Sequence, residues 1–277
     1  MGVALIRELA IRELVASAGD ACDAGRCPEA IDALEAAVRK YPGNYRLHYL
    51  LGLCHSGICR THALCDSGIA IRYQRHALEL LGPENGAERA TVLEALASTL
   101  ARLGEPGALR ESIEFHREAG AIYRQAGQME DWARLQFNLG NSCCELSELT
   151  GENHWHTAVG YYENALQVRT RQKNPERHAA VLENLGSAWR RLDVRRAILC
   201  YRRALRIYNR TDYPAQNAAI ENNLGNAFLS LPRTGRRTVV RNAMRALRHF
   251  DRALQGCDSE VIRRNREEAR SRLAKKN

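Results

Sequence analysis

Asparagine side chains recur at equivalent places in three segments of this 277-residue chain. Each segment reads Asn-Leu-Gly followed by Asn or Ser, and the segments begin at Asn138, Asn184 and Asn223. An asparagine side chain offers one hydrogen-bond acceptor and two donors, so it can pair with a peptide unit as another backbone would. On an α-helix, residues three apart share a face, and adjacent residues are rotated by about 100°. We therefore expect the two polar residues of each segment to project together while the leucine enters the core.

A second helix is expected after each of these segments, with alanine, an aromatic residue and alanine at one fixed spacing. The three sets are Ala158, Tyr162 and Ala165, then Ala197, Tyr201 and Ala204, then Ala246, Phe250 and Ala253. Upstream, Leu51-Gly52 and Leu96-Ala97 continue the first-helix pattern, and the leucines of the five segments are separated by 45, 43, 46 and 39 residues. A two-helix unit that repeats along a chain indicates an array of stacked helix pairs.

This pattern resembles the tetratricopeptide repeat, a helix–turn–helix unit of about 34 residues with small and aromatic residues at these positions. The unit from about Ile11 to Asn44 has that length, and the later units look like the extended repeats of bacterial signalling and scaffold proteins. The resemblance implies an all-α fold, namely a right-handed α-solenoid of about six antiparallel helix pairs. We expect the array to occupy residues 1–257 and a C-terminal capping helix to occupy residues 258–277. The second-helix pattern weakens around residues 70–77 and 112–119.

Glycines in the first helices need a structural reason, because a glycine inside a helix costs about 1 kcal/mol relative to alanine. They are Gly140, Gly186 and Gly225. We expect the second helix to approach closely there because its alanines add no bulk, with the aromatic residues filling the gap toward the neighbouring unit. Loop signals separate the expected helices at Pro42-Gly43, Asn174-Pro175 and Tyr213-Pro214. No segment alternates with a period of two, so no strands are expected.

The polar face of the first helices is the candidate partner-binding surface. The family that this sequence resembles lines the concave face with its first helices, and asparagines there hydrogen-bond the backbone of a bound peptide. The candidate site comprises Arg134, Phe137, Asn138, Asn141, Asn184, Ser187, Arg191, Asn222, Asn223 and Asn226. The alternative is that each amide bonds to a neighbouring helix and has only a structural role.

Charge is distributed unevenly along the chain. Residues 1–150 hold 15 Lys and Arg against 20 Asp and Glu, whereas residues 151–277 hold 26 against 12. Four arginines at helical spacing, Arg241, Arg245, Arg248 and Arg252, predict a basic stripe on the last second helix. The stripe is either a solvated outer face or a contact for an anionic partner, such as an acidic peptide or nucleic-acid phosphates. The stripe contains no interleaved aromatic residues for base stacking, which argues against nucleic acid.

Nine cysteines do not fit a secreted disulfide scaffold, because their number is odd and the chain is long. One cluster has soft ligands at short spacing: Cys54, His55, Cys59, His62 and Cys65. Such a cluster can bind zinc, but it lacks the paired Cys-x2-Cys arrangement, so packing or exposed positions are the favoured interpretation. No phosphate loop, nucleophile elbow or zinc-protease motif occurs, so we expect no enzyme and no cofactor.

The sequence therefore predicts an interaction scaffold that binds a partner protein or peptide, such as an acidic one, in a concave groove. A basic solenoid that binds nucleic acid through the C-terminal half is the first alternative, and a peptide-sensing regulatory protein is the second. The N-terminus meets Arg7 and Glu8 after a short apolar run, which is too short for a signal peptide. No stretch reaches the apolar length of a membrane span, so we expect a cytoplasmic protein without a membrane contact.

Overall fold

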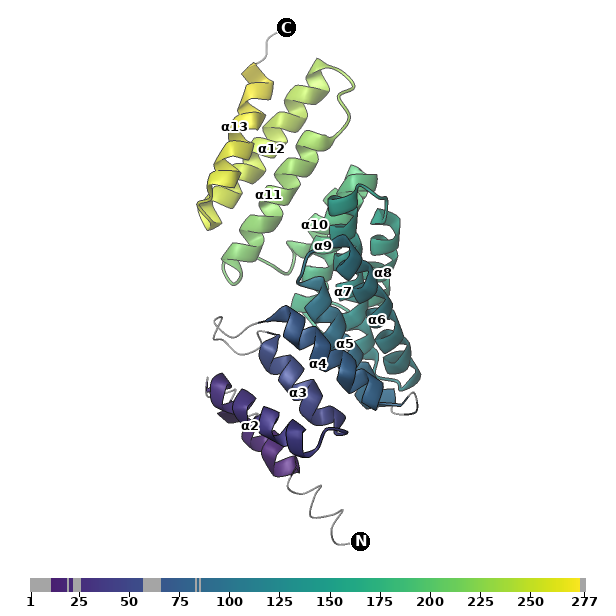
Figure 1. Ribbon diagram of the computed structural model, residues 1–277. Helices are drawn as coiled ribbons and strands as arrows, with labels where there is room; N and C mark the ends of the chain where they lie inside the picture. Colours follow the sequence, from purple (N-terminus) through teal and green to yellow (C-terminus); the bar gives the residue numbers. More distant parts are fainter. Residues whose placement is uncertain are drawn as a thin grey trace. The chain divides into compact units, whose positions relative to one another are not determined.

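The structure, a computed structural model, describes residues 11–18, 20–21, 26–56, 66–82, 84 and 86–274, and the regular elements within these ranges are helices (Figure 1). In the N-terminal part they are α2 (Cys27–Lys40), α3 (Tyr45–His55), α4 (Ser67–Leu80), α5 (Gly86–Ala101) and α6 (Pro106–Gln125). They continue as α7 (Met129–Thr150), α8 (Trp155–Val168), α9 (Pro175–Leu192), α10 (Val194–Ala204), α11 (Pro214–Ser230), α12 (Arg236–Gly256) and α13 (Glu260–Ala274). The predicted all-α class is confirmed.

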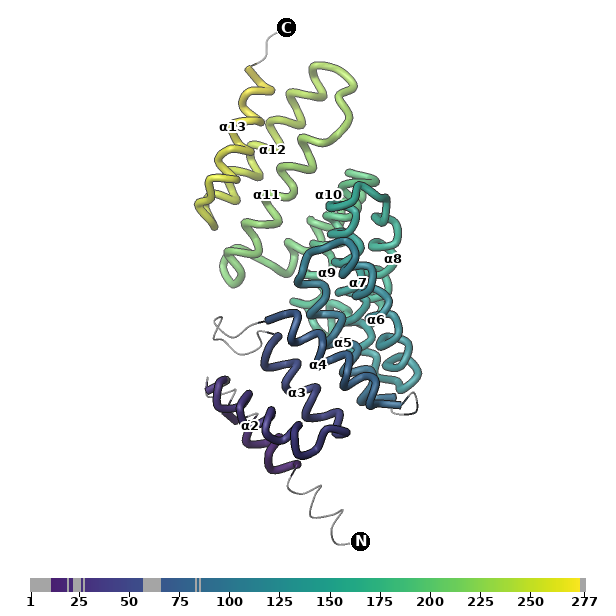
Figure 2. Tube along the Cα trace, in the orientation of Figure 1, coloured from purple at the N-terminus to yellow at the C-terminus, as the bar shows by residue number. Residues whose placement is uncertain are grey.

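The chain divides into two compact units, Met1–Leu135 and Gln136–Asn277, and the boundary lies inside α7. Within each unit, helices that follow one another in the sequence pack side by side (Figure 2). In the N-terminal unit, α3 packs on α4 and α5 on α6, with further contacts of α2 with α3 and of α4 with α5. In the C-terminal unit, the pairs α9–α10 and α11–α12 have the same relation, and α10 also packs on α11. This is the sequential pairing that the repeat predicts.

Helix α13 packs on both α12 and α11. Nδ2 of Asn265 donates to Oδ1 of Asn222 at 2.9 Å, and Nη1 of Arg272 donates to the backbone oxygen of Leu229 at 2.6 Å. Both contacts join residues 43 positions apart. The same separation joins Asn184 on α9 to Asn141 on α7. Helix α13 thus meets α11 as a further first helix would, while its role as a stabilising cap stays a prediction.

The helix starts follow from the loop signals in the sequence. Oδ1 of Asn44 accepts from the backbone N–H groups of Arg46 and Leu47, which caps α3. Oδ1 of Asn174 caps α9 in the same way, and proline occupies the first turn of α9 and of α11. A side-chain acceptor satisfies N–H groups that have no partner inside the helix, and proline has no N–H to satisfy there.

The glycines of the first helices make room for the aromatic rings of the second helices. A Cβ atom added to Gly140 would lie 2.5 Å from the Tyr162 ring, one on Gly186 would lie 2.6 Å from Tyr201, and one on Gly225 would lie 2.4 Å from Phe250. The three aromatic side chains are almost fully buried. The expected close approach is therefore found, but the expected cause is corrected. The ring itself fills the space over the glycine, because it inserts between the two helices of its own pair.

In the two second helices where the repeat pattern weakens, a polar residue occupies the position that the aromatic residue holds in the other pairs. Gln74 on α4 is fully buried, and its Cγ atom lies 2.6 Å from where a Cβ of Gly52 would be. Its side-chain nitrogen and oxygen have no hydrogen-bond partner among the described residues. His116 on α6 occupies the next such position beside Ser112, whose hydroxyl donates to the Ala97 backbone oxygen at 2.7 Å. The aromatic position is thus kept in space although the residue type changes.

Candidate functional site

Polar side chains occupy equivalent positions on the successive first helices of the C-terminal unit, and we call these residues the first-helix row. Its members are Asn138 and Asn141 on α7, Asn184 and Ser187 on α9, and Asn222, Asn223 and Asn226 on α11. All of them are half-buried. The Asn184–Asn141 hydrogen bond of 2.9 Å joins α9 to α7, and α9 also contacts α11. The structure therefore joins Asn141 and Asn184 directly, while the use of the row as one binding surface stays a prediction.

The amides of the row differ in how much hydrogen-bonding capacity the protein itself uses. Oδ1 of Asn141 accepts a bond of 2.8 Å from the Tyr162 hydroxyl in addition to the one from Asn184. In the next pair, the Ser187 hydroxyl shares a bond of 3.1 Å with the Tyr201 hydroxyl. Burial raises the pKa of both tyrosines above the ordinary value, so their hydroxyls stay protonated. Asn141 and Ser187 therefore use part of their hydrogen-bonding capacity within the protein.

Other members of the row have no such partner. Asn226 occupies the position of Asn141 and Ser187, but the second-helix residue of its pair is Phe250, which has no hydroxyl. Within the described part of the chain, the side chains of Asn138, Asn223 and Asn226 make no hydrogen bond. Three half-buried amides on α7 and α11 therefore keep their full set of donors and acceptors.

The residues that flank the row have partners within the protein. Arg191 donates to Glu148 at 3.3 Å, and its guanidinium lies 5.2 Å from the centre of the Trp155 ring. Arg134 pairs with Asp131 at 2.8 Å and with Glu94, and all three lie in the N-terminal unit.

Aromatic packing also holds Phe137, whose ring centre lies 5.9 Å from that of Tyr162. The guanidinium of Arg169 lies 5.7 Å from the Phe137 ring. Burial raises the pKa of the nearby Glu183 carboxyl, which precedes Asn184 on α9. The flanks of the row therefore combine an aromatic edge with a carboxyl whose charged form is disfavoured by desolvation.

Sequence reasoning missed the tyrosine hydroxyls as partners of the row. The signal was present, since the polar position reads Asn, Ser, Asn while the aromatic position reads Tyr, Tyr, Phe. A polar residue facing a buried tyrosine satisfies its hydroxyl, and the exchange to phenylalanine removes that need.

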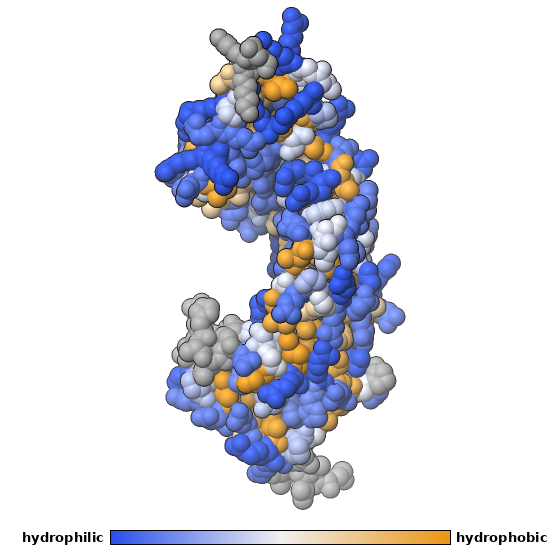
Figure 3. Space-filling model, turned by 45° about the horizontal axis from the view of Figure 1, so that its top comes forward, coloured by the Kyte–Doolittle hydropathy of each residue, from blue (hydrophilic) through white to orange (hydrophobic). Residues whose placement is uncertain are grey.

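The arginine stripe predicted on the last second helix lies on α12, and its members are exposed. Arg252 lies 3.8 Å from the carboxylate of Glu221, which is buried and also bonded to His249. Figure 3 shows hydrophilic side chains over most of the visible surface near the C-terminal helices α11 to α13. The stripe is therefore exposed, and two of its members, Arg241 and Arg245, line a cavity together with arginines of α10.

The candidate zinc cluster lies mostly outside the described residues, because Cys59, His62 and Cys65 fall in the range 57–65. Of the remaining two, Cys54 is buried and His55 stacks on Tyr73 with ring centres 6.1 Å apart. Within the described ranges, no group of three or more His, Cys, Asp or Glu side chains is placed to hold a metal ion. No helix in the same ranges is both long and apolar enough to cross a membrane.

Comparison with known proteins gives the fold. No protein-family model matches the chain, and no curated protein matches it significantly. The solved apo form of RapI matches with a TM-score of 0.62 at 14% identity, covering 96% of this chain and 99% of RapI. PilF of Pseudomonas aeruginosa matches with a TM-score of 0.62 at 15% identity, covering 96% of this chain and 98% of its own.

A third match is YrrB, described as a TPR protein with an unusual peptide-binding site. It has a TM-score of 0.56 at 14% identity, and the match covers 86% of this chain and 99% of YrrB. Identities this low show a shared architecture and nothing about ligands. The chain therefore has the fold of tetratricopeptide-repeat proteins.

Proposed function

We propose that this protein is a non-enzymatic binding scaffold that holds a peptide segment of a partner protein against the first-helix row. The observation that supports the proposal is a set of half-buried amides without a hydrogen-bond partner among the described residues, Asn138, Asn223 and Asn226. A polar group that is partly shielded from water and unpaired gains most from a new partner, because little hydration is lost when the bond forms. A peptide backbone supplies such partners at regular intervals along an extended chain.

Recognition in this proposal divides between two kinds of residue. The amides bind the main chain of the peptide and do not distinguish its side chains. The flanking residues, such as Phe137 and Glu183, then favour particular side chains. Solved proteins of the same architecture include YrrB, described as having a peptide-binding site, and this supports a peptide as the ligand. We further propose the cytoplasm as the compartment in which the scaffold works.

Selection from a displayed library of random peptides tests the proposal. Peptides recovered on the wild-type protein are synthesised, and their dissociation constants are measured against Asn138→Ala, Asn223→Ala and Asn226→Ala. Each substitution is expected to weaken binding about fivefold, the equivalent of about 1 kcal/mol for one hydrogen bond. The matched controls are Gln167→Ala and Gln216→Ala, which remove exposed amides of the same unit outside the row.

Main-chain recognition also requires backbone N–H groups on the peptide ligand. A recovered peptide with N-methylated backbone amides keeps its side chains but loses its N–H donors. We expect it to bind at least about tenfold more weakly than its parent, since several bonds to the amides are lost together. If the row variants and the control variants bind every recovered peptide equally well, the row is not the binding surface.

Nucleic-acid binding is the second candidate, supported by the excess of 26 Lys and Arg over 12 Asp and Glu in residues 151–277. Such binding would depend on phosphate contacts and fall steeply with salt. A labelled single-stranded oligonucleotide measured at two salt concentrations separates the two candidates. Reversing the charge of Arg241, Arg245 and Arg248 would abolish oligonucleotide binding, whereas the asparagine substitutions would leave it unchanged.

A further inference from the structure

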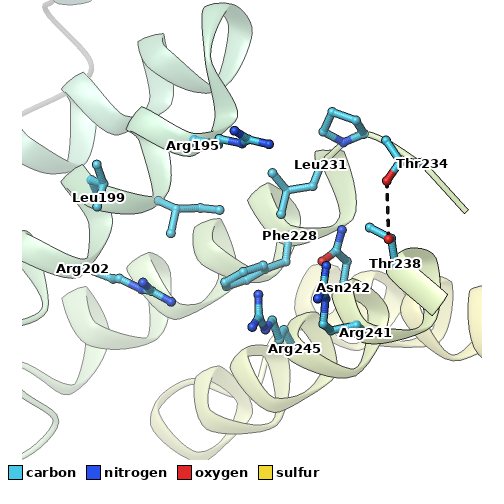
Figure 4. Close-up of a pocket in the computed structure, with 12 residues that line it drawn as sticks. Arg195, Leu199, Arg202, Phe228, Leu231, Thr234, Thr238, Arg241, Asn242 and Arg245 are labelled. Atoms are coloured by element: carbon cyan, nitrogen blue, oxygen red, sulfur yellow. Dashed lines mark hydrogen bonds between the residues drawn. The ribbon is translucent and has the colours of Figure 1, made fainter.

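We propose that the C-terminal unit carries a second binding site, separate from the first-helix row, which takes an acidic peptide segment containing one apolar side chain. The site is a cavity of about 450 Å³ between α10 and α12, with α11 behind it (Figure 4). Second helices supply most of its lining, whereas the row lies on first helices. The proposal therefore does not depend on the function proposed for the row.

Four arginines surround this cavity. Arg195 and Arg202 come from α10, and Arg241 and Arg245 come from α12. Figure 4 shows their side chains extending along the cavity from both helices. None of the residues that line the cavity is an aspartate or a glutamate. The cavity therefore concentrates positive charge from two helices that are distant in sequence.

These arginines have no carboxylate partner among the residues that the structure describes. Other arginines of the C-terminal unit pair with carboxylates, for example Arg191 with Glu148 and Arg263 with Asp258. The four cavity arginines form no ion pair within the described part of the chain. Like charges held close together repel one another, so an anionic ligand relieves a cost that the protein otherwise carries.

The ring of Phe228 on α11 holds two of the four guanidinium groups in place. The guanidinium of Arg245 lies 5.6 Å from the ring centre and that of Arg202 lies 6.0 Å from it. Cation–π contacts of this kind fix the direction of long side chains before a ligand arrives. A site whose charges are already positioned loses less entropy on binding than one built from freely moving arginines.

The start of α12 adds to the positive potential. Its first turn has no acidic residue, and its N-cap, Gly235, provides no side-chain acceptor. The cavity reaches this turn through Thr234 and Thr238. The N-terminus of a helix carries a partial positive charge and unpaired N–H groups, so a carboxylate near it is stabilised.

Asn242 of α12 lines the same cavity, and its side chain is buried. It makes no side-chain hydrogen bond to the residues that the structure describes. An amide in this state can accept from or donate to a peptide backbone. The cavity thus offers a main-chain contact beside its charges.

The apolar part of the lining decides the class of ligand. Leu199 on α10 is 59% exposed, and Ile198 and Leu231 belong to the same lining. An exposed leucine gains from an apolar partner, which inorganic phosphate does not supply. Phe228 is 3% exposed and its ring stacks on His249 at 5.3 Å, so no aromatic surface is open for a nucleobase. Carboxylates next to an apolar side chain fit all of these features.

Fluorescence polarisation on the full chain tests the proposal with a defined probe. The probe is a short fluorescein-labelled peptide in which pairs of glutamates flank one leucine. We expect saturable binding, with Arg202→Glu/Arg245→Glu weakening it about tenfold or more because charge-assisted contacts are reversed. The matched control is Arg206→Glu/Arg264→Glu, which changes two exposed arginines outside the cavity. Each reversal removes two charge units, so both double variants lower the formal net charge from +9 to +5.

Peptide variants test the two parts of the recognition separately. Replacing the glutamates by glutamine should remove binding, and replacing the leucine by serine should weaken it by about the same factor as Leu199→Ser in the protein. Asn226→Ala on the row should leave the loss of affinity caused by Arg202→Glu/Arg245→Glu unchanged, because the two sites bind independently. Arg195→Glu/Arg241→Glu repeats the test with arginines that do not contact Phe228, in case loss of that contact lowers the melting temperature.

Several results would overturn the proposal. The proposal is wrong if the dissociation constant of the probe for the wild-type protein is above about 1 mM. It also fails if the control pair of reversals weakens binding as much as the cavity pair, because binding then follows net charge alone. Tighter binding of an oligonucleotide or of inorganic phosphate, with the same dependence on Arg202 and Arg245, would assign the cavity to phosphate ligands instead.

Discussion

The hydroxyl of Tyr162 on α8 donates a hydrogen bond of 2.8 Å to Oδ1 of Asn141 on α7. This side-chain bond joins the two helices. The ring of the same tyrosine lies over Gly140, one residue before the asparagine. One side chain therefore fixes both the spacing of the helices and the orientation of an amide in the row. The arrangement explains why a polar residue follows the glycine in the two pairs whose second helix carries a tyrosine, Tyr162 or Tyr201.

Tyr162→Phe removes the hydroxyl and keeps the ring. We expect the variant to lose about 1 kcal/mol of unfolding free energy, because Asn141 then lacks one of its buried partners. Urea denaturation followed by circular dichroism measures the change. A variant as stable as the wild type would show that the hydrogen bond contributes nothing to the pair.

Phe250→Tyr makes the opposite change where the row has an unpartnered amide. The new hydroxyl should reach Asn226 as Tyr162 reaches Asn141, so we expect unchanged or higher stability. Peptides that bind to the row should then bind more weakly, since the Asn226 amide becomes occupied. A loss of stability as large as that of Tyr162→Phe would contradict the equivalence of the two positions.

Gly186→Ala tests the space that the aromatic ring requires. The added Cβ would lie 2.6 Å from the Tyr201 ring, so we expect a loss of about 1–3 kcal/mol from overpacking. Gly160→Ala on α8 is the matched control, because nothing lies within 4 Å of its added Cβ. That substitution should stabilise the protein by up to about 1 kcal/mol through helix propensity. Similar effects of the two substitutions would rule out the packing explanation.

His116 predicts acid sensitivity of the N-terminal unit. Burial lowers its pKa from 6.5 to about 4, and its Nε2 atom has no hydrogen-bond partner among the described residues. The His116 imidazole therefore stays neutral in the folded protein at pH values below 6.5, where the imidazole of the unfolded chain binds a proton. Stability is complete above pH 6.5 and is lost as the pH falls toward 4, by a total on the order of 3 kcal/mol.

His116→Gln removes this titration, and glutamine already occupies the equivalent position at residue 74. Unfolding free energies measured from pH 7 to pH 4 should fall less steeply for this variant than for the wild type. The exposed His156→Gln serves as the control and should keep the wild-type slope. Parallel slopes for all three proteins would exclude His116 as the acid-sensitive group.

Deletion of residues 258–277 tests whether α13 stabilises the array. The deletion removes the buried Ile262 and Ala269 and the bonds to Asn222 and Leu229, and it uncovers apolar surface on α11 and α12. We expect a lower melting temperature and aggregation, since terminal units of repeat proteins need a polar outer surface. A chain shortened only by residues 275–277 is the control. An equally soluble and stable 1–257 chain would refute the role of α13 as a cap.

Much of the fold could be predicted because each helix pair repeats the same local signals. Caps such as Asn44 and Asn174, the alanine–aromatic–alanine spacing and the internal glycines depend on residues close in sequence. The contact partner of Gly186 could not be derived in this way. Whether a ring or an alanine meets the glycine depends on how the two helices are rotated about their axes, which periodicity alone does not specify.

The same limit applies to the candidate sites. The row could be predicted, because residues three apart on a helix share a face and the helices repeat. The arginine cavity could not, although the stripe on α12 was visible in the sequence. Its second half comes from Arg195 and Arg202, and their position opposite α12 follows from the packing of α10 and α12 around α11. Contacts of this kind depend on tertiary packing.

The buried Gln74 has a consequence for the order in which the protein unfolds. Repeat arrays lose structure unit by unit, and each unit opens according to its own stability and that of its neighbouring interfaces. Gln74 holds two polar atoms away from water without a hydrogen-bond partner in the described part of the chain, at the place where the C-terminal pairs bury a ring. We therefore expect the α3–α4 pair to open more readily than the pairs that bury a ring. Its backbone amide hydrogens should exchange with deuterium before those of α9 to α12.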